Sequence, residues 1–268
     1  MTALPTLLAG QELPFAPGEQ LTYKVRVGKF GTVGKGTMTV EGPVLVRDVQ
    51  TYVLRFELKA RVAFVSAADR TASWIDPQRM ASLRFHKHER HPLSKHDERV
   101  ELYPDDHRWE RAPGDTGVSP TGAPLDELSF IYFVRTLPLV PDTTYELTRH
   151  FEAGRNPIKV TIVRRDTLVT EAGTFATVFV ELRVKDPRRY KGEGVIGIHL
   201  SDDRLRLPVR ITSAMPVLGS TILTLAAYTQ GATVATAGGV DQRRGMPDAG
   251  ESGALTQVPR SSDRRSPR

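Results

Sequence analysis

The chain has 268 residues, and its 39% hydrophobic and 25% charged residues are typical of a globular protein that buries a sizeable core. Its formal net charge is +6, of which residues 232–268 contribute +2. In the rest of the chain, Lys and Arg residues are interleaved with Asp and Glu, so the clustered cations of a nucleic-acid binder are missing. We therefore expect no nucleic-acid partner. The lack of cysteine excludes disulfides, thiol nucleophiles and cysteine-bound zinc or iron–sulfur clusters.

The N-terminal segment, residues 1–12, contains a short apolar run from Leu4 to Leu8 followed by the small residues Ala9 and Gly10. This pattern is typical of the second half of a secretory signal and its cleavage region, without the basic front end. We expect a remnant of a signal or a disordered N-terminus, with the true start further upstream, in a periplasmic or otherwise exported protein. A cytoplasmic protein is the alternative. No other segment approaches the roughly twenty apolar residues of a transmembrane helix, so no transmembrane span is expected.

From residue 20 onward, apolar and polar residues alternate with a period of two, which predicts β-strands. Glycines in "GKFGTVGKG" (28–36) predict a mobile hairpin turn, since the spacing and following helix of a phosphate loop are absent. Pro208 lacks a backbone donor, so its strand should be at an edge or bulged there. The predicted strands are 21–27, 37–46, 51–62, 71–76, 81–90, 98–103, 143–152, 158–170, 174–184, 194–200, 205–215 and 220–229.

One segment, residues 121–139, interrupts this alternation and predicts a helix. Pro124 suits a first helical position, and Asp126 and Glu127 suit the positive end of a helix dipole. Arg135 suits the last turn. The strands therefore fall into two groups separated by a single helix.

The helix is apolar on nearly every side, because Ser129 is the one polar residue between Leu128 and Val134. Such a helix has to be covered by other parts of the fold. We expect an all-β fold, a single curved antiparallel sheet or half-open barrel of about 10–12 strands, with this principal helix packed on its concave or open face. Residues 13–231 should form one β-rich domain, and residues 232–268 a disordered tail rich in Arg, Gly, Ser and Pro.

Four histidines fall within residues 85–96. On an extended strand, His86 and His88 point to one face and could share a zinc or copper ion, whereas His91 could join them only if the strand bends. The neighbouring Lys and Arg residues disfavour a dication. The alternative is a solvated strand face whose polar residues keep a sheet edge soluble, and this alternative is favoured.

Three polar or amphipathic residues of the helix, Ser129, Tyr132 and Arg135, lie three apart and hence along one stripe. Neither a Gly-x-Ser-x-Gly motif nor an assignable histidine supports Ser129 as a nucleophile. Together with Trp74, these residues are candidates for lining a ligand groove. In the structural alternative, Arg135 and the Tyr132 hydroxyl bond to backbone carbonyls where the helix meets the sheet.

Asp202 and Asp203 could form a pair of catalytic carboxylates with different pKa values. Adjacent residues in a tight turn usually face away from one another, however. A turn that caps itself is therefore the favoured interpretation.

Four segments of the sequence, in their order along the chain, resemble the bacterial family called domain of unknown function 3108. The resemblance covers about residues 13–230, and its most specific part is "LSDDRLRLPVRI" within the last segment. It implies an exported, mostly β protein with no assigned enzyme activity. The segments are "LPFAPGEQLTYKVRVGKFGTVGKGTMTV", "LDELSFIYFVRTLPL", "EAGTFATVFVELRV" and "GIHLSDDRLRLPVRI".

Two functions follow from these observations. The first is a non-enzymatic cell-envelope protein with a groove for a hydrophobic small molecule or for an envelope protein, without a cofactor. The second is a metal-dependent envelope hydrolase that uses His86, His88 and His91. The excess apolarity of the helix favours the first.

Overall fold

The computed structural model describes residues 12–62, 65–91, 94–185, 193–215 and 219–232. All of them belong to one compact unit, Met1–Val234, and the second unit, Ala235–Arg268, lies outside the described residues. The expectations for residues 1–12 and 232–268 therefore concern segments that, apart from Glu12 and Ala232, are not described.

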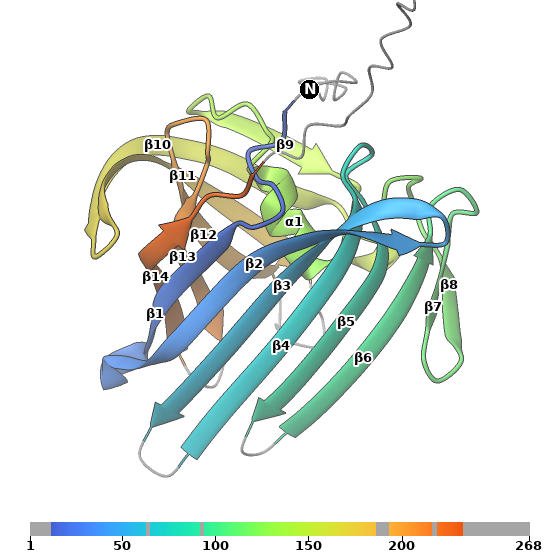
Figure 1. The fold of residues 1–268 in the computed structure, drawn as a ribbon, viewed down its shortest axis with the longest axis horizontal. Coiled ribbons are helices and arrows are strands. Elements are labelled where there is room, and N and C mark those ends of the chain that lie inside the picture. Colours follow the sequence, from blue (N-terminus) through green and yellow to red (C-terminus); the bar gives the residue numbers. More distant parts are fainter. Residues whose placement is uncertain (1–11, 63–64, 92–93, 186–192, 216–218, 233–268) are drawn as a thin grey trace, which may run out of the picture. The chain divides into compact units, whose positions relative to one another are not determined.

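Fourteen antiparallel strands in the described part of the chain form one sheet (Figure 1). Their order is β8-β7-β6-β5-β4-β3-β2-β1-β14-β13-β12-β11-β10-β9. Consecutive strands pair with each other, except β8 and β9, and β14 pairs with β1, so β8 and β9 form the two edges. The strands are β1 (Gln20–Val27), β2 (Thr32–Val46), β3 (Val49–Val62), β4 (Val65–Asp76), β5 (Ala81–His91), β6 (Ser94–Tyr103), β7 (Arg108–Arg111), β8 (Asp115–Val118), β9 (Thr143–Leu147), β10 (Ile158–Thr170), β11 (Gly173–Lys185), β12 (Glu193–Ser201), β13 (Pro208–Met215) and β14 (Gly219–Thr229).

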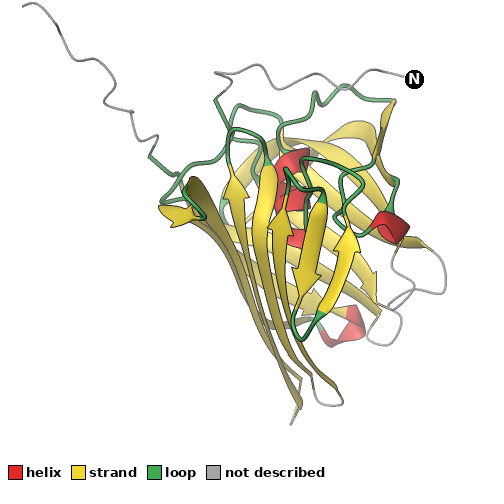
Figure 2. Cartoon of the chain, turned by 90° about the vertical axis from the view of Figure 1, so that its right-hand side faces the viewer, coloured by secondary structure: helices red, strands yellow, loops and turns green. Residues whose placement is uncertain are grey.

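The described residues contain one α-helix, α1 (Glu127–Val134), and the sheet curls around it so that the helix lies on its concave side (Figures 1 and 2). This confirms the predicted curved sheet with one principal apolar helix. The connection between the two edge strands contains α1, and the helix contacts β3 and β4. Short 3-10 turns, η1 (Gly28–Phe30) and η2 (Ala153–Arg155), complete the described elements. No helix in the described ranges has both the length and the apolarity needed to cross a bilayer.

Strand alternation builds the core. In β1 the side chains of Leu21, Tyr23 and Val25 are fully buried, whereas Lys24 and Arg26 are exposed on the other face. The same alternation in β2, β3 and β10–β14 directs apolar rows inward, and these rows form the main hydrophobic core with the helix. Inward residues of β5 and β6 form a second cluster with Trp109 and Phe151. The short strands β7 and β8, of four residues each, exceed the predicted strand number because so few residues show no clear alternation.

The glycine-rich segment at 28–36 is mostly strand, which corrects the predicted mobile turn. The turn is confined to η1 and Gly31, and β2 begins at Thr32. Gly34 pairs directly with Ala60 of β3, and a Cβ atom at Gly34 would lie 2.0 Å from the carbonyl oxygen of Lys59. This glycine therefore allows two strands to approach closely.

The helix begins later than the sequence predicted. Asp126 is the N-cap residue, and its Oδ1 accepts hydrogen bonds from the backbone N–H groups of Leu128 and Ser129, each at 2.9 Å. Pro124 lies before this cap, and its carbonyl oxygen accepts a hydrogen bond from the backbone N–H of Ser82 at 2.7 Å. The proline thus attaches the chain to β5 and does not start the helix.

The bulge expected at Pro208 is confirmed. The register between β12 and β13 shifts between His199 and Leu200, and Leu200 pairs with Pro208. The shift accommodates the missing backbone donor of the proline.

Candidate functional site

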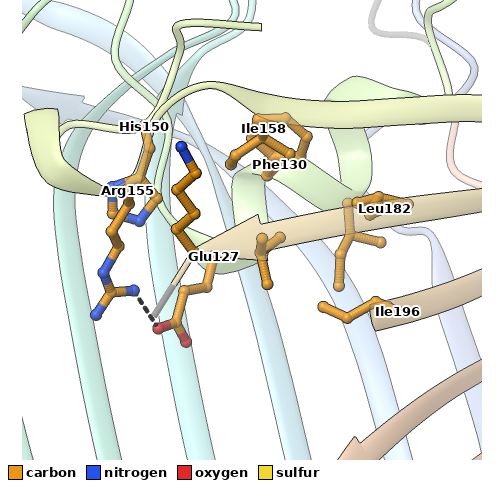
Figure 3. Close-up of a pocket in the computed structure, with 10 residues that line it drawn as sticks. Glu127, Phe130, His150, Arg155, Ile158, Leu182 and Ile196 are labelled. Atoms are coloured by element: carbon orange, nitrogen blue, oxygen red, sulfur yellow. Dashed lines mark hydrogen bonds and ion pairs between the residues drawn. The ribbon is translucent and has the colours of Figure 1, made fainter. Parts of the chain in front are cut away.

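A pocket of about 100 Å³ lies between α1 and strands β10, β11 and β12 (Figure 3). Leu182 of β11 and Ile196 of β12 face each other across the strand pair. Phe130 and Ile131 come from the helix, and Ile131 is the one residue of its apolar run that is not fully covered. The wall is predominantly apolar and is completed by Ile158 and Val184.

The remaining wall of the pocket is polar and comprises Glu127, His150, Arg155 and Lys185. Figure 3 shows His150, Arg155 and Glu127 together on one side of the pocket, and Phe130, Ile158, Leu182 and Ile196 on the other. The pocket therefore has the division into apolar and charged parts that an amphipathic molecule needs.

Glu127 connects the pocket to a charged network on the concave face of the sheet. Its carboxylate accepts a hydrogen bond from Arg155 at 3.0 Å and another from the nearly buried Lys87 of β5. Arg155 also pairs with Glu152, and Glu152 pairs with Arg111 of β7. These contacts join the helix, the loop around η2 and the sheet next to edge strand β8. The charged side of the pocket is thus held in place by paired side chains.

Three of the residues predicted to line a groove lie in the protein interior instead. Ser129 and Tyr132 are fully buried and Arg135 is 1% exposed, and none of them lines the pocket. Arg135 donates hydrogen bonds to the carbonyl oxygens of Pro14 and Leu205 at 2.8 and 3.0 Å, as the structural alternative predicted. The Tyr132 hydroxyl has no hydrogen-bond partner among the described residues, and burial raises its pKa above the usual value.

The fourth groove candidate, Trp74, lies on the outer face of the sheet. Its neighbour Ser73 points inward, where its hydroxyl donates a hydrogen bond to Asp126 at 2.5 Å. The Trp74 ring meets the ring of His86 edge-on at 5.0 Å between centroids, and the guanidinium of Arg84 lies over it at 5.6 Å. Strand alternation therefore separates Trp74 from the pocket.

The three candidate metal ligands do not share one face. By alternation, His86 and His88 lie on the outer face of β5 and His91 on the inner face, where its Nε2 is 2.7 Å from Asp69. His88 is 3.3 Å from Asp97. Within the described ranges, no three His, Cys, Asp or Glu side chains are arranged to hold a metal ion. The described residues offer no third ligand to His86 and His88, and a metal centre built on these histidines stays a prediction.

His86 lines a second, wider pocket of about 460 Å³ on the outer face, together with Arg84, Arg99, Glu101 and Arg111. Burial, with the charges of Arg84 and Arg99, lowers the pKa of His86. Arg84 pairs with Glu101 at 2.5 Å, and Arg111 is engaged in the inner network. With cations and carboxylates already paired, this surface shows no selectivity for one sign of charge.

Asp202 and Asp203 form a turn and not a carboxylate pair. Asp203 Oδ1 accepts hydrogen bonds from the backbone N–H groups of Leu205 and Arg206 at 2.9 and 3.1 Å. Asp202 Oδ2 accepts a hydrogen bond from Arg165 Nε at 2.9 Å. Each carboxylate is thus occupied by separate partners, as expected of a turn that caps itself.

Sequence reasoning missed the pocket because its wall combines the helix with three strands distant in the chain. The alternation of Leu182 and Val184 showed which way they face but not what they face. The one available signal was the uninterrupted apolarity of the helix around Ile131, which predicted a covered helix without locating the gap beside it.

Comparison with known proteins agrees with this geometry. A family described as protein of unknown function DUF3108 matches residues 22–226. No protein with a curated description matches the chain. Among solved structures, a beta-barrel-like protein of domain of unknown function DUF1849 from Brucella abortus has a TM-score of 0.54 at 11% identity, covering 80% of this chain and 98% of that one. The hypothetical protein CT021 from Chlamydia trachomatis has a TM-score of 0.36 at 11% identity, covering 81% and 89%. The first shares the fold, and the family match extends over most of the sequence, so the chain belongs to the DUF3108 family of proteins of unknown function.

Proposed function

We propose that the protein is a non-enzymatic cell-envelope protein that binds a hydrophobic or amphipathic small molecule in the pocket beside α1. The observation that carries this proposal is the apolar wall of the pocket, in which Ile131 and Ile196 are only partly buried beside the buried Leu182. Ligand sites in proteins are typically concave and mostly apolar, with a few placed polar groups.

The size of the pocket limits what it can enclose. At about 100 Å³ it is smaller than an apolar cavity of about 150 Å³, which can hold benzene, and far below the roughly 300–1,000 Å³ of pockets for drug-sized molecules. It therefore suits a short segment of an alkyl chain.

The proposed compartment rests on the sequence. The apolar run from Leu4 to Leu8 followed by Ala9 and Gly10 is typical of a secretory signal, and these residues lie outside the described part of the structure. Members of the family that this chain resembles look like exported proteins. A molecule with an alkyl chain would be abundant in such an envelope.

Filling the pocket should abolish ligand binding. Ile196→Trp places a larger side chain in the space beside Leu182, and because Ile196 is only partly buried the ring can enter without displacing the core. We expect the unmodified protein, incubated with a mixture of single-chain lipids and passed through gel filtration, to carry an adduct in native mass spectrometry. Ile196→Trp should carry less than a tenth as much.

Val169→Trp is the matched control, since it adds the same ring at a site on β10 that is 73% exposed. It should retain the adduct. An unmodified protein that carries none after incubation, or equal adducts in both variants, would contradict the proposed site.

A further inference from the structure

The wall of the pocket holds one cation that no described residue neutralises. Lys185, the last residue of β11, lines the pocket with Glu127 and Arg155. Glu127 and Arg155 form an ion pair at 3.0 Å. Lys185 makes neither a hydrogen bond nor an ion pair with the residues that the structure describes, although Glu193 lies opposite it in the β11–β12 register.

The position of Lys185 favours an anion inside the pocket. Lys185 is partly buried, and it lines the pocket next to the apolar Val184. The two cations of the wall, Arg155 and Lys185, face one carboxylate, Glu127, which also receives a hydrogen bond from Lys87. Arg155 is further paired with Glu152, so Lys185 is the lining cation without a carboxylate partner among the described residues, and it lies beside an apolar floor.

We infer that the ligand is a single-chain amphiphile with a compact anionic head, a carboxylate or a phosphate monoester, and that Lys185 binds this head. The inference rests on the proposed function and adds the charge of the ligand to it. The part of the alkyl chain next to the head occupies the space between Ile131, Leu182 and Ile196, and the rest of the chain extends beyond the pocket. The head lies at the polar wall, where a charge-assisted hydrogen bond from an ammonium group is stronger than one between neutral groups.

The test compares probes that share one chain and differ in the head: dodecanoate, dodecyl phosphate, dodecanol and dodecyltrimethylammonium, each titrated below its micellar concentration into the full chain. Both anionic probes should bind about tenfold more tightly than dodecanol, since a hydrogen bond to a charged group contributes roughly that factor. Whichever anion binds more tightly identifies the head group, and either supports the inference.

Lys185→Met should reduce the preference for anions over dodecanol to about one, and Lys185→Glu should reverse it in favour of dodecyltrimethylammonium. Lys159→Met is the matched control, because Lys159 carries the same charge on β10 but pairs with Glu146 outside the pocket. It should keep the preference. Thermal unfolding of each variant confirms that the fold is intact.

Two results would overturn the inference, and they can be told apart. Equal affinity of unmodified protein for dodecanoate, dodecyl phosphate and dodecanol would refute the role of Lys185 and leave the proposed apolar site standing. Failure of all four probes to bind would refute the proposed function together with the inference.

Discussion

Glu19→Gln should lower the free energy of unfolding by about 3 kcal/mol, because it leaves a buried guanidinium without its counter-ion. Glu19 is 3% exposed and Arg135 1% exposed, and two hydrogen bonds of 2.7 Å join their side chains. Breaking one partner of a buried pair is far more damaging than removing an exposed pair, since no water replaces the lost contact.

Glu19 favours the charged form of Arg135. Burial alone would lower the pKa of Arg135, but the hydrogen bonds and negative charge of Glu19 outweigh it and raise the pKa. The pair connects the segment before β1 to the end of α1, and the same guanidinium reaches the carbonyl of Leu205 in the turn before β13. Losing Glu19 therefore affects three parts of the chain at once.

Urea unfolding checks this prediction, with the midpoint compared at constant slope. Glu41→Gln is the matched control, because Glu41 pairs with Arg55 at 2.8 Å on the surface, and it should cost less than about 1 kcal/mol. The double variant Glu19→Met with Arg135→Met removes both charges and should recover much of the loss. A similar small loss in Glu19→Gln and Glu41→Gln would show that the buried pair contributes nothing special.

The pattern of apolar and polar residues along the sequence predicted most of the secondary structure, but it predicted few of the tertiary contacts between elements. Alternation located β1 and the long strands because the inward and outward positions differ in polarity along the chain itself. The apolarity of α1 likewise showed that the sheet must cover it. The pairing of Glu19 with Arg135, across more than a hundred residues, has no local signature, because an isolated Glu near the N-terminus looks solvated.

The pocket follows the same rule. Leu182 and Ile196 were recognisable as inward-facing strand residues, but their meeting with Ile131 depends on how the helix crosses the sheet. The groove residues chosen from sequence, such as Tyr132, were chosen for their polarity on an apolar helix. A polar residue on an apolar helix can equally be a buried side chain that holds the helix in place through interior contacts, as Arg135 does.

Asp126→Ala should lower the free energy of unfolding by about 3 kcal/mol, since it removes a helix cap and leaves buried hydroxyl groups unpaired. The carboxylate is fully buried and accepts hydrogen bonds from Ser73 at 2.5 Å and Ser82 at 2.7 Å as well as from the helix N-terminus. It thereby fixes the start of α1 to β4 and β5. Asp105→Ala, at an exposed residue paired with Arg79, is the control and should cost less than about 1 kcal/mol.

The charge of Asp126 makes this effect depend on pH. Burial raises the pKa of Asp126 above its usual value of 3.8, against the opposing hydrogen bonds from Ser73, Ser129 and Ser82. The folded state therefore binds this proton more tightly than the unfolded state, so the contribution of Asp126 is fully present below pH 3.8 and declines as the pH rises through the folded pKa. Asn cannot titrate, so the stability advantage of the unmodified protein over Asp126→Asn should be largest in acid and shrink as the pH rises. Urea unfolding of both proteins at a series of pH values measures this, and an advantage that grows with pH would show instead that Asp126 is held as a favourable buried anion.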